Sequence, residues 1–250
     1  MEAFIPVSPN MVFEPNPAFG NFDNGIIFGL FRLVDENFSK ALEKNPYSSK
    51  PCIISYNHFL DMPMCCREGD CHHIYLRCES NFWCQWMFQF AHEYCHHLID
   101  GELTGDISGL IWFEECVCEL SSMYHLRNLA LYFATSSQEH LLRYAPSVHN
   151  YLGGLMDVEM ELVSETNHPG ILHRWGTLLQ EPKYHRLHYR AIAARMFPLF
   201  VENPHLWKII LHFGDMRQWE SPDELFQHLR QNATADYAHS LEKLHLLLLS

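Results

Sequence analysis

The most constraining feature of this 250-residue chain is a strongly apolar segment, residues 82–99, that carries two histidines and a glutamate at helical spacing. Its other residues are mostly large and apolar: Phe82, Trp83, Trp86, Met87, Phe88, Phe90, Ala91, Leu98 and Ile99. A helix that is apolar on nearly every side is buried. Burying His92, Glu93 and His96 without partners would cost on the order of several kcal/mol, so we expect a bound group that supplies partners.

The polar residues of this segment form an HExxH pattern, His92-Glu93-Tyr94-Cys95-His96. Residues four apart on an α-helix lie on nearly the same face, about 6 Å apart along the axis. Two imidazoles at that spacing can hold one zinc ion, and Glu93 then projects beside the metal, where it can take a proton from water. The alternative interpretation, a polar patch facing solvent, conflicts with how little polar surface the helix has.

A carboxylate follows at a suitable distance on a second apolar segment, WFEECVCELSS. Eighteen residues, 97–114, separate His96 from Glu115, which is the predicted third ligand. Glu119 lies four residues further on and can accept the Nδ1–H of a ligand histidine, which would fix the tautomer of that histidine. Glu114 and Glu119 remain alternatives to Glu115 as the ligand, and a plain surface acid remains an alternative role for Glu119.

Taken together, HExxH, an eighteen-residue spacer and Glu115 resemble the gluzincin pattern of thermolysin-like and M1-aminopeptidase-like zinc peptidases. Residues 112–115 are similar to the aromatic-rich segment that carries the glutamate ligand in the M1 family. Residues 88–93 are similar to the metallopeptidase-like domains of the ImmA/IrrE type. The resemblance covers about residues 70–125, and it includes no match to the M1 exopeptidase motif, so aminopeptidase activity is not implied.

The resemblance implies a zinc-dependent metallopeptidase, a hydrolase with one Zn²⁺ per chain and a peptide or protein as substrate. Peptide bonds would be hydrolysed by a metal-activated water, with Glu93 as the general base. The developing oxyanion needs a further donor, and the sequence does not choose among Tyr184, His185, Tyr189, Tyr237 and His239. The main alternative is a catalytically silent zincin-like sensor or protein-interaction domain that retains a metal. Two others are a hydrolase of non-peptide substrates and a metal-free helical interaction protein.

Periodicity elsewhere predicts an α+β, mostly helical fold. Strands are expected over residues 51–57 and 72–78, and helices over 25–42, 82–99, 110–133, 148–163, 184–200, 205–213, 222–231 and 233–249. Residues 1–25 are expected to form an extended surface arm, and residues 58–70 an irregular stretch. We expect a zincin-like catalytic unit with a small sheet over residues 1–135 and an all-α lobe that closes the cleft over 136–250. Residues 72–78 could offer an exposed strand edge to an extended peptide.

The composition excludes several classes of partner. The formal net charge is −13 and no Lys/Arg cluster is present, which argues against nucleic acid and against anionic lipid as partners. Because the apolar runs are too short to span a bilayer and the N-terminus lacks a secretory signal, we expect a cytoplasmic protein with no membrane contact. No feature indicates an oligomeric state.

The nine cysteines are expected to be reduced, as buried small hydrophobes or metal ligands. One cluster could bind a second, structural zinc, although it lacks paired CxxC spacing: Cys65, Cys66, Cys71, His72, His73 and Cys78. Cys95, Cys116 and Cys118 are expected to pack between the two motif helices. His97, next to the motif, is expected to be a packing or surface residue.

Overall fold

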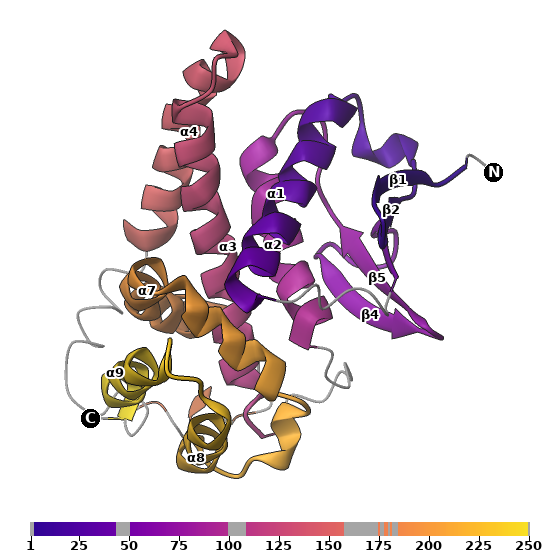
Figure 1. Cartoon of the computed structure of the whole chain (residues 1–250). Coiled ribbons are helices and arrows are strands. Elements are labelled where there is room, and N and C mark those ends of the chain that lie inside the picture. The colour runs from indigo at the N-terminus through magenta and orange to yellow at the C-terminus, as the bar shows by residue number, and fades with distance from the viewer. Residues whose placement is uncertain are drawn as a thin grey trace. The chain divides into compact units, whose positions relative to one another are not determined.

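The computed structural model of this chain describes residues 3–43, 51–99, 109–157, 175, 178–179, 181 and 185–249 (Figure 1). The expected α+β, mostly helical class is confirmed. The chain forms two compact units, one from residues 1–98 and 125–152 and the other from residues 99–124 and 153–250. This division differs from the predicted boundary at residue 135, because the helix Ile111–Ala134 contributes residues to both units.

The first unit contains, within the described residues, a five-stranded mixed sheet of order β1-β2-β3-β5-β4. Its strands are β1 (Ile5–Ser8), β2 (Met11–Phe13), β3 (Cys52–Tyr56), β4 (Met64–Glu68) and β5 (Cys71–Leu76). The pairs β1–β2 and β4–β5 are antiparallel, and the pairs β2–β3 and β3–β5 are parallel. The two strands predicted over 51–57 and 72–78 are therefore the neighbouring central strands β3 and β5.

Three sequence expectations about the sheet were wrong. The N-terminal residues are not a surface arm, because β1 and β2 extend the sheet and Phe13 lies in the core. Residues 64–68 are not irregular, since they pair with β5 through a turn at Gly69, whose φ of 64° suits glycine. Residues 72–78 do not form an edge, because β5 lies between β3 and β4, and within the described residues the edge strands are β1 and β4. Strands this short, one of them ending in charged residues, carry too few positions to show an alternating pattern.

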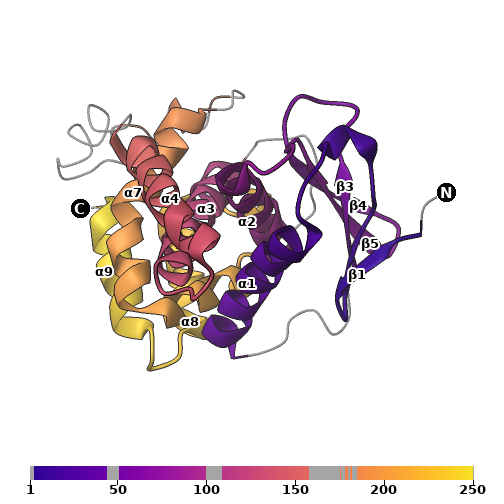
Figure 2. The same cartoon turned by 90° about the horizontal axis from the view of Figure 1, so that it is seen from above.

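Two helices lie on the same face of this sheet, α1 (Asn24–Leu42) and α2 (Trp83–Ile99) (Figure 2). Both match their predicted ranges, and the Asp23 side chain caps α1 by accepting a hydrogen bond from the Ile26 N–H. Buried aromatic rings join the sheet to the helices. Ring centroids are 5.1 Å apart for Phe13 and Phe19, and 4.9 Å apart for Phe19 and Trp86.

The remaining described elements are helical: α3 (Ile111–Ala134), α4 (Glu139–Asp157), α7 (Arg186–Glu202), α8 (Pro222–Asn232), α9 (Ala238–Leu249) and the 3-10 helices η1 (Pro17–Phe19), η2 (Pro204–His212) and η3 (Met216–Gln218). A 3-10 helix, Pro204–His212, therefore stands where an α-helix was expected over 205–213. Helix α4 begins nine residues before the predicted start at 148, because the buried side chains of Leu141 and Ala145 give its first turns an apolar face. It also contains Pro146. Residues 158–163 of that prediction lie outside the described residues. None of the described helices is long and apolar enough to cross a membrane.

The aromatic core predicts a large stability effect at Phe31, which is fully buried and whose ring centroid lies 4.3 Å from that of Phe90. The substitution Phe31→Ala should lower the free energy of unfolding by about 3–5 kcal/mol, because it removes apolar burial and leaves a cavity. Urea unfolding followed by circular dichroism measures this. The control Phe59→Ala, at a side chain that is 79% exposed, should change it by less than about 0.5 kcal/mol. Equal effects at both positions would contradict the assigned core.

Candidate metal centre

The HExxH residues lie in the second half of α2, as the sequence predicted. His92 and His96 lie one turn apart with ring centroids separated by 5.1 Å. Their exposed fractions are 5% and 7%, and that of Glu93 is 4%. The expected burial of all three polar side chains in an apolar helix is therefore confirmed.

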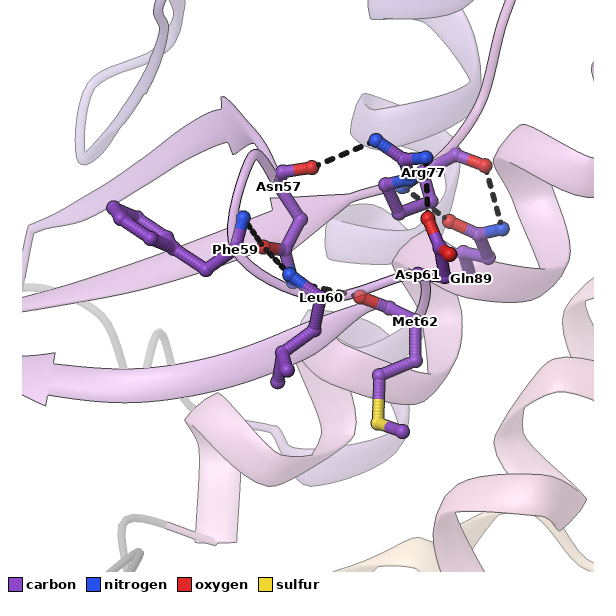
Figure 3. A network of polar contacts seen from close by, with 7 residues as sticks. All are labelled: Asn57, Phe59, Leu60, Asp61, Met62, Arg77 and Gln89. Carbon is purple, nitrogen blue, oxygen red and sulfur yellow. Dashed lines mark hydrogen bonds and ion pairs between the residues drawn. The ribbon is translucent and has the colours of Figure 1, made fainter.

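Helix α2 is hydrogen-bonded to the end of β5 just before the motif. Gln89, three residues ahead of His92, accepts from the Arg77 backbone N–H with its Oε1 at 2.8 Å and donates from its Nε2 to the Arg77 carbonyl at 3.0 Å (Figure 3). The amide of Gln89 thus pairs with the main chain of Arg77 in the way that a neighbouring strand would. Sequence reasoning missed this residue, although a Gln in such an apolar helix is a signal that it has a specific partner.

A second hydrogen bond joins α2 to β5 just after the motif. The Nδ1 atoms of His97 and His72 are 2.8 Å apart, and both residues are buried. His97 also stacks on Tyr94, whose hydroxyl donates to Asp35 at 2.9 Å. The expectation that His97 is a packing residue is confirmed, and the surface alternative is wrong. Hydrogen bonds on both sides of the motif therefore fix the position of α2 on the sheet.

The same network orders the turn between β3 and β4 (Figure 3). The Arg77 guanidinium donates to the Asn57 carbonyl at 3.0 Å and to Asp61 at 2.6 Å. The buried Asn57 side chain accepts from the N–H groups of Phe59 and Leu60 and donates to the Met62 carbonyl. One connected set of bonds therefore links the turn that precedes β4, the end of β5 and the motif helix.

Glu115, on α3, completes a group that could hold a metal ion. His92, His96 and Glu115 each offer one ligand atom, and these atoms all lie within 4.8 Å of one another. Ligand atoms around one tetrahedral zinc ion are roughly 3.5 Å apart, so small side-chain adjustments would complete the site. Two imidazoles and a carboxylate are also a donor set that zinc accepts. Among the described residues Glu114, the alternative ligand, is buried but is not part of this group.

Glu119 lies one turn after Glu115 and its side chain is 0% exposed, which excludes the surface-acid alternative. Its Oε1 accepts from Arg186 Nε at 2.9 Å, and its Oε2 accepts from Arg190 Nε at 3.1 Å. Both arginines belong to α7, and neither was singled out from the sequence. The expected hydrogen bond from a ligand histidine to Glu119 stays a prediction.

Of the five candidate oxyanion donors, Tyr189 of α7 has the closest electrostatic link to the group. It is buried, and this burial raises the pKa of its phenol, with the negative charge of Glu115 adding to the rise. Tyr237 is also buried, and its hydroxyl donates to the Asn232 carbonyl. His185 is the N-cap residue of α7 and His239 is exposed. Tyr184 lies outside the described residues.

The cysteines behave as buried small side chains in most cases. All nine are free, and Cys95, Cys116 and Cys118 are fully buried, as expected for packing residues. Burial raises the pKa of the Cys78 and Cys116 thiols well above its ordinary value, so neither forms a thiolate readily. Burial, helped by Glu68, raises the pKa of Cys66 to about 11.

The metal-binding groups found in the described residues do not include the proposed second zinc cluster (Cys65, Cys66, Cys71, His72, His73 and Cys78). One further group, Glu43, His205 and Asp236, does meet the same distance criterion but is more exposed. Asp236 of this group already forms an ion pair with Lys208 Nζ. A positive charge already in place disfavours a cation there, so the group containing His92 is the stronger candidate.

No protein-family model, curated protein or solved structure matches this chain. The gluzincin resemblance therefore rests on the motif residues themselves.

The Gln89–Arg77 contact predicts that Gln89→Leu lowers the free energy of unfolding by about 1–3 kcal/mol, because it leaves the backbone N–H and C=O of Arg77 without this partner. Leucine has nearly the same volume, so little cavity forms. Urea unfolding gives the change, and Gln85→Leu, on the same helix, serves as the matched control. A Gln89→Leu variant as stable as the wild type would show that these bonds do not hold α2.

Proposed function

We propose that this chain is a zinc-dependent metallopeptidase with one Zn²⁺ held by His92, His96 and Glu115. The observation that carries the proposal is the convergence of the three ligand atoms within 4.8 Å, with a buried Glu93 next to the first ligand. A site that only stabilised the fold would need a fourth protein ligand and no adjacent base. Three protein ligands with the carboxylate of Glu93 beside them therefore suit a catalytic site better than a structural one.

The roles of the protein groups follow from their chemistry. A zinc ion at this site would supply Lewis acidity, lowering the pKa of a water toward neutrality and polarising the substrate carbonyl. Glu93 is the general base that accepts the proton of the attacking water at its carboxylate and passes it to the leaving amine nitrogen. The low exposure of Glu93 supports this role, because a carboxylate shielded from bulk water holds the proton until the amine leaves.

Tyr189 is our proposed donor to the oxyanion that develops on the substrate carbonyl. Its phenol is buried on α7, and the charge of Glu115 contributes to the raised pKa of this phenol. A raised pKa keeps the phenol protonated at neutral pH, as a hydrogen-bond donor must be.

A peptide or protein segment is the proposed substrate class. The edge strand β4 pairs with β5 along one side, so within the described residues its other side can accept an extended chain by main-chain hydrogen bonds. The free cysteines suit a reducing compartment, and we propose the cytoplasm. The net charge of −13 argues against nucleic acid as a partner.

The metal site is tested first by elemental analysis of the purified chain. Wild type should contain about one zinc per chain, and His92→Ala should lose it, because two remaining ligands hold zinc weakly. The control His239→Ala, at an exposed histidine, should keep the wild-type content. Absence of zinc from the wild type, even after zinc is added back, would sink the proposal.

The base is tested by Glu93→Gln, which keeps the shape of the side chain and removes its proton acceptor. Zinc content should stay the same, whereas turnover of an unstructured protein or a peptide library should fall by about 10²–10⁴-fold. Glu79→Gln, at an exposed acid near α2, is the control and should retain activity. A wild type that holds zinc but cleaves nothing in such libraries would favour the catalytically silent sensor.

A further inference from the structure

The second unit contains a buried carboxylate held by two arginines. Glu119 on α3 is 0% exposed, and each of its oxygens accepts from one guanidinium of α7. The side chain of Arg190 is 13% exposed and that of Arg186 is 41% exposed. Because the two arginines lie four residues apart, they project from nearly the same face of α7, and both bind Glu119 on α3.

Stability alone is a poor explanation for this arrangement. The free-energy cost of removing a carboxylate and a guanidinium from water is about as large as the gain from their attraction. A pair of apolar side chains of similar volume often stabilises a protein equally well. Such a cluster does specify geometry, because the planar fork of arginine binds a carboxylate oxygen in few orientations. Two guanidinium groups, each bound to one oxygen of the same carboxylate, therefore restrict both the rotation of α3 about its axis and its position along α7.

The position of Glu119 gives that geometry a chemical consequence. Glu115 lies one turn earlier on α3, so both carboxylates project from nearly the same face of the helix. A rotation of α3 that displaced Glu119 from its arginines would move the Glu115 oxygen by a similar amount. Zinc tolerates errors of only about 0.2 Å in its ligand distances, so such a rotation would weaken binding.

Tyr189 supports the same picture from the α7 side. It lies between Arg186 and Arg190 in sequence, and the charge of Glu115 helps to raise the pKa of its buried phenol. The stretch of α7 from Arg186 to Arg190 therefore covers the stretch of α3 from Glu115 to Glu119.

We infer that Glu119 is a positioning residue: held by Arg186 and Arg190, it orients α3 so that Glu115 can serve as the carboxylate ligand of the metal. The inference rests on the proposed metal site and does not depend on the peptidase activity. It stands independently of the hydrogen bond to a ligand histidine that the spacing suggested for Glu119.

The test measures zinc affinity of the full chain by competition with a chelator, together with the visible absorption of the Co²⁺-loaded protein, which reports ligand geometry. Glu119→Gln should weaken zinc binding by about 10–100-fold, the range typical of groups that orient a ligand. It should also alter the Co²⁺ bands. Glu119→Asp, which keeps the charge, should recover part of the affinity. Urea unfolding of the metal-free proteins shows whether each variant is folded.

Glu242→Gln is the matched control, because Glu242 pairs with Arg230 in the same unit, away from Glu115 in sequence. It should leave zinc affinity within about twofold of wild type, since it removes an exposed ion pair of the same kind. Arg186→Lys is the second test variant, for use if Glu119→Gln does not fold. It keeps the positive charge on a half-exposed side chain but loses the fork, and it should weaken zinc binding several-fold.

The outcomes separate the two proposals. If Glu119→Gln and Arg186→Lys bind zinc as tightly as wild type, with unchanged Co²⁺ bands, Glu119 does not position Glu115, whatever the loss of stability. If both weaken zinc binding in a protein that cleaves no peptide, the positioning role holds and the peptidase proposal fails. A wild type that binds no zinc overturns both.

Discussion

The candidate site depends on how α2 is held against the sheet. An apolar helix packs by burial alone with little preference for one rotation over another, because most of its faces are equally suited to a core. The hydrogen bonds from Gln89 to Arg77 and from His97 to His72 remove that freedom. They act on both sides of the motif, so the direction in which His92 and His96 project is set by directional bonds rather than by shape.

The same principle operates on the second motif helix. Helix α3 buries several polar side chains among apolar ones near Glu115, and one of them, Glu119, is ion-paired with Arg186 and Arg190. In both helices a polar side chain within one turn of a candidate ligand makes the orienting contact. If the site holds a metal, the motif consists of two parts: the candidate ligands, and the neighbouring residues whose hydrogen bonds or ion pairs orient them.

The sequence predicted which residues would form the group that could hold a metal ion, but it did not predict the neighbours of these residues. Spacing on a helix is a local property, so HExxH placed His92 and His96 on one face without knowledge of the fold, and the apolar surroundings predicted their burial. The partners of Gln89 and Glu119 lie 12 and 67 or more residues away in sequence, and no local pattern reports contacts of that kind. The N-terminal strands were missed for a related reason, because Met11–Phe13 joins the main sheet by pairing with the distant Cys52–Tyr56.

Helix α3 has a consequence for how the chain can be divided. Residues up to Tyr124 belong to one compact unit and residues from His125 to the other, and each unit is assembled from two separate segments. No single cut in the polypeptide can therefore release either unit whole. A ribosome that has synthesised the HExxH helix must still add the stretch up to residue 152 before the first unit is complete. A fragment designed to end near residue 135 would lack part of the unit it was meant to isolate.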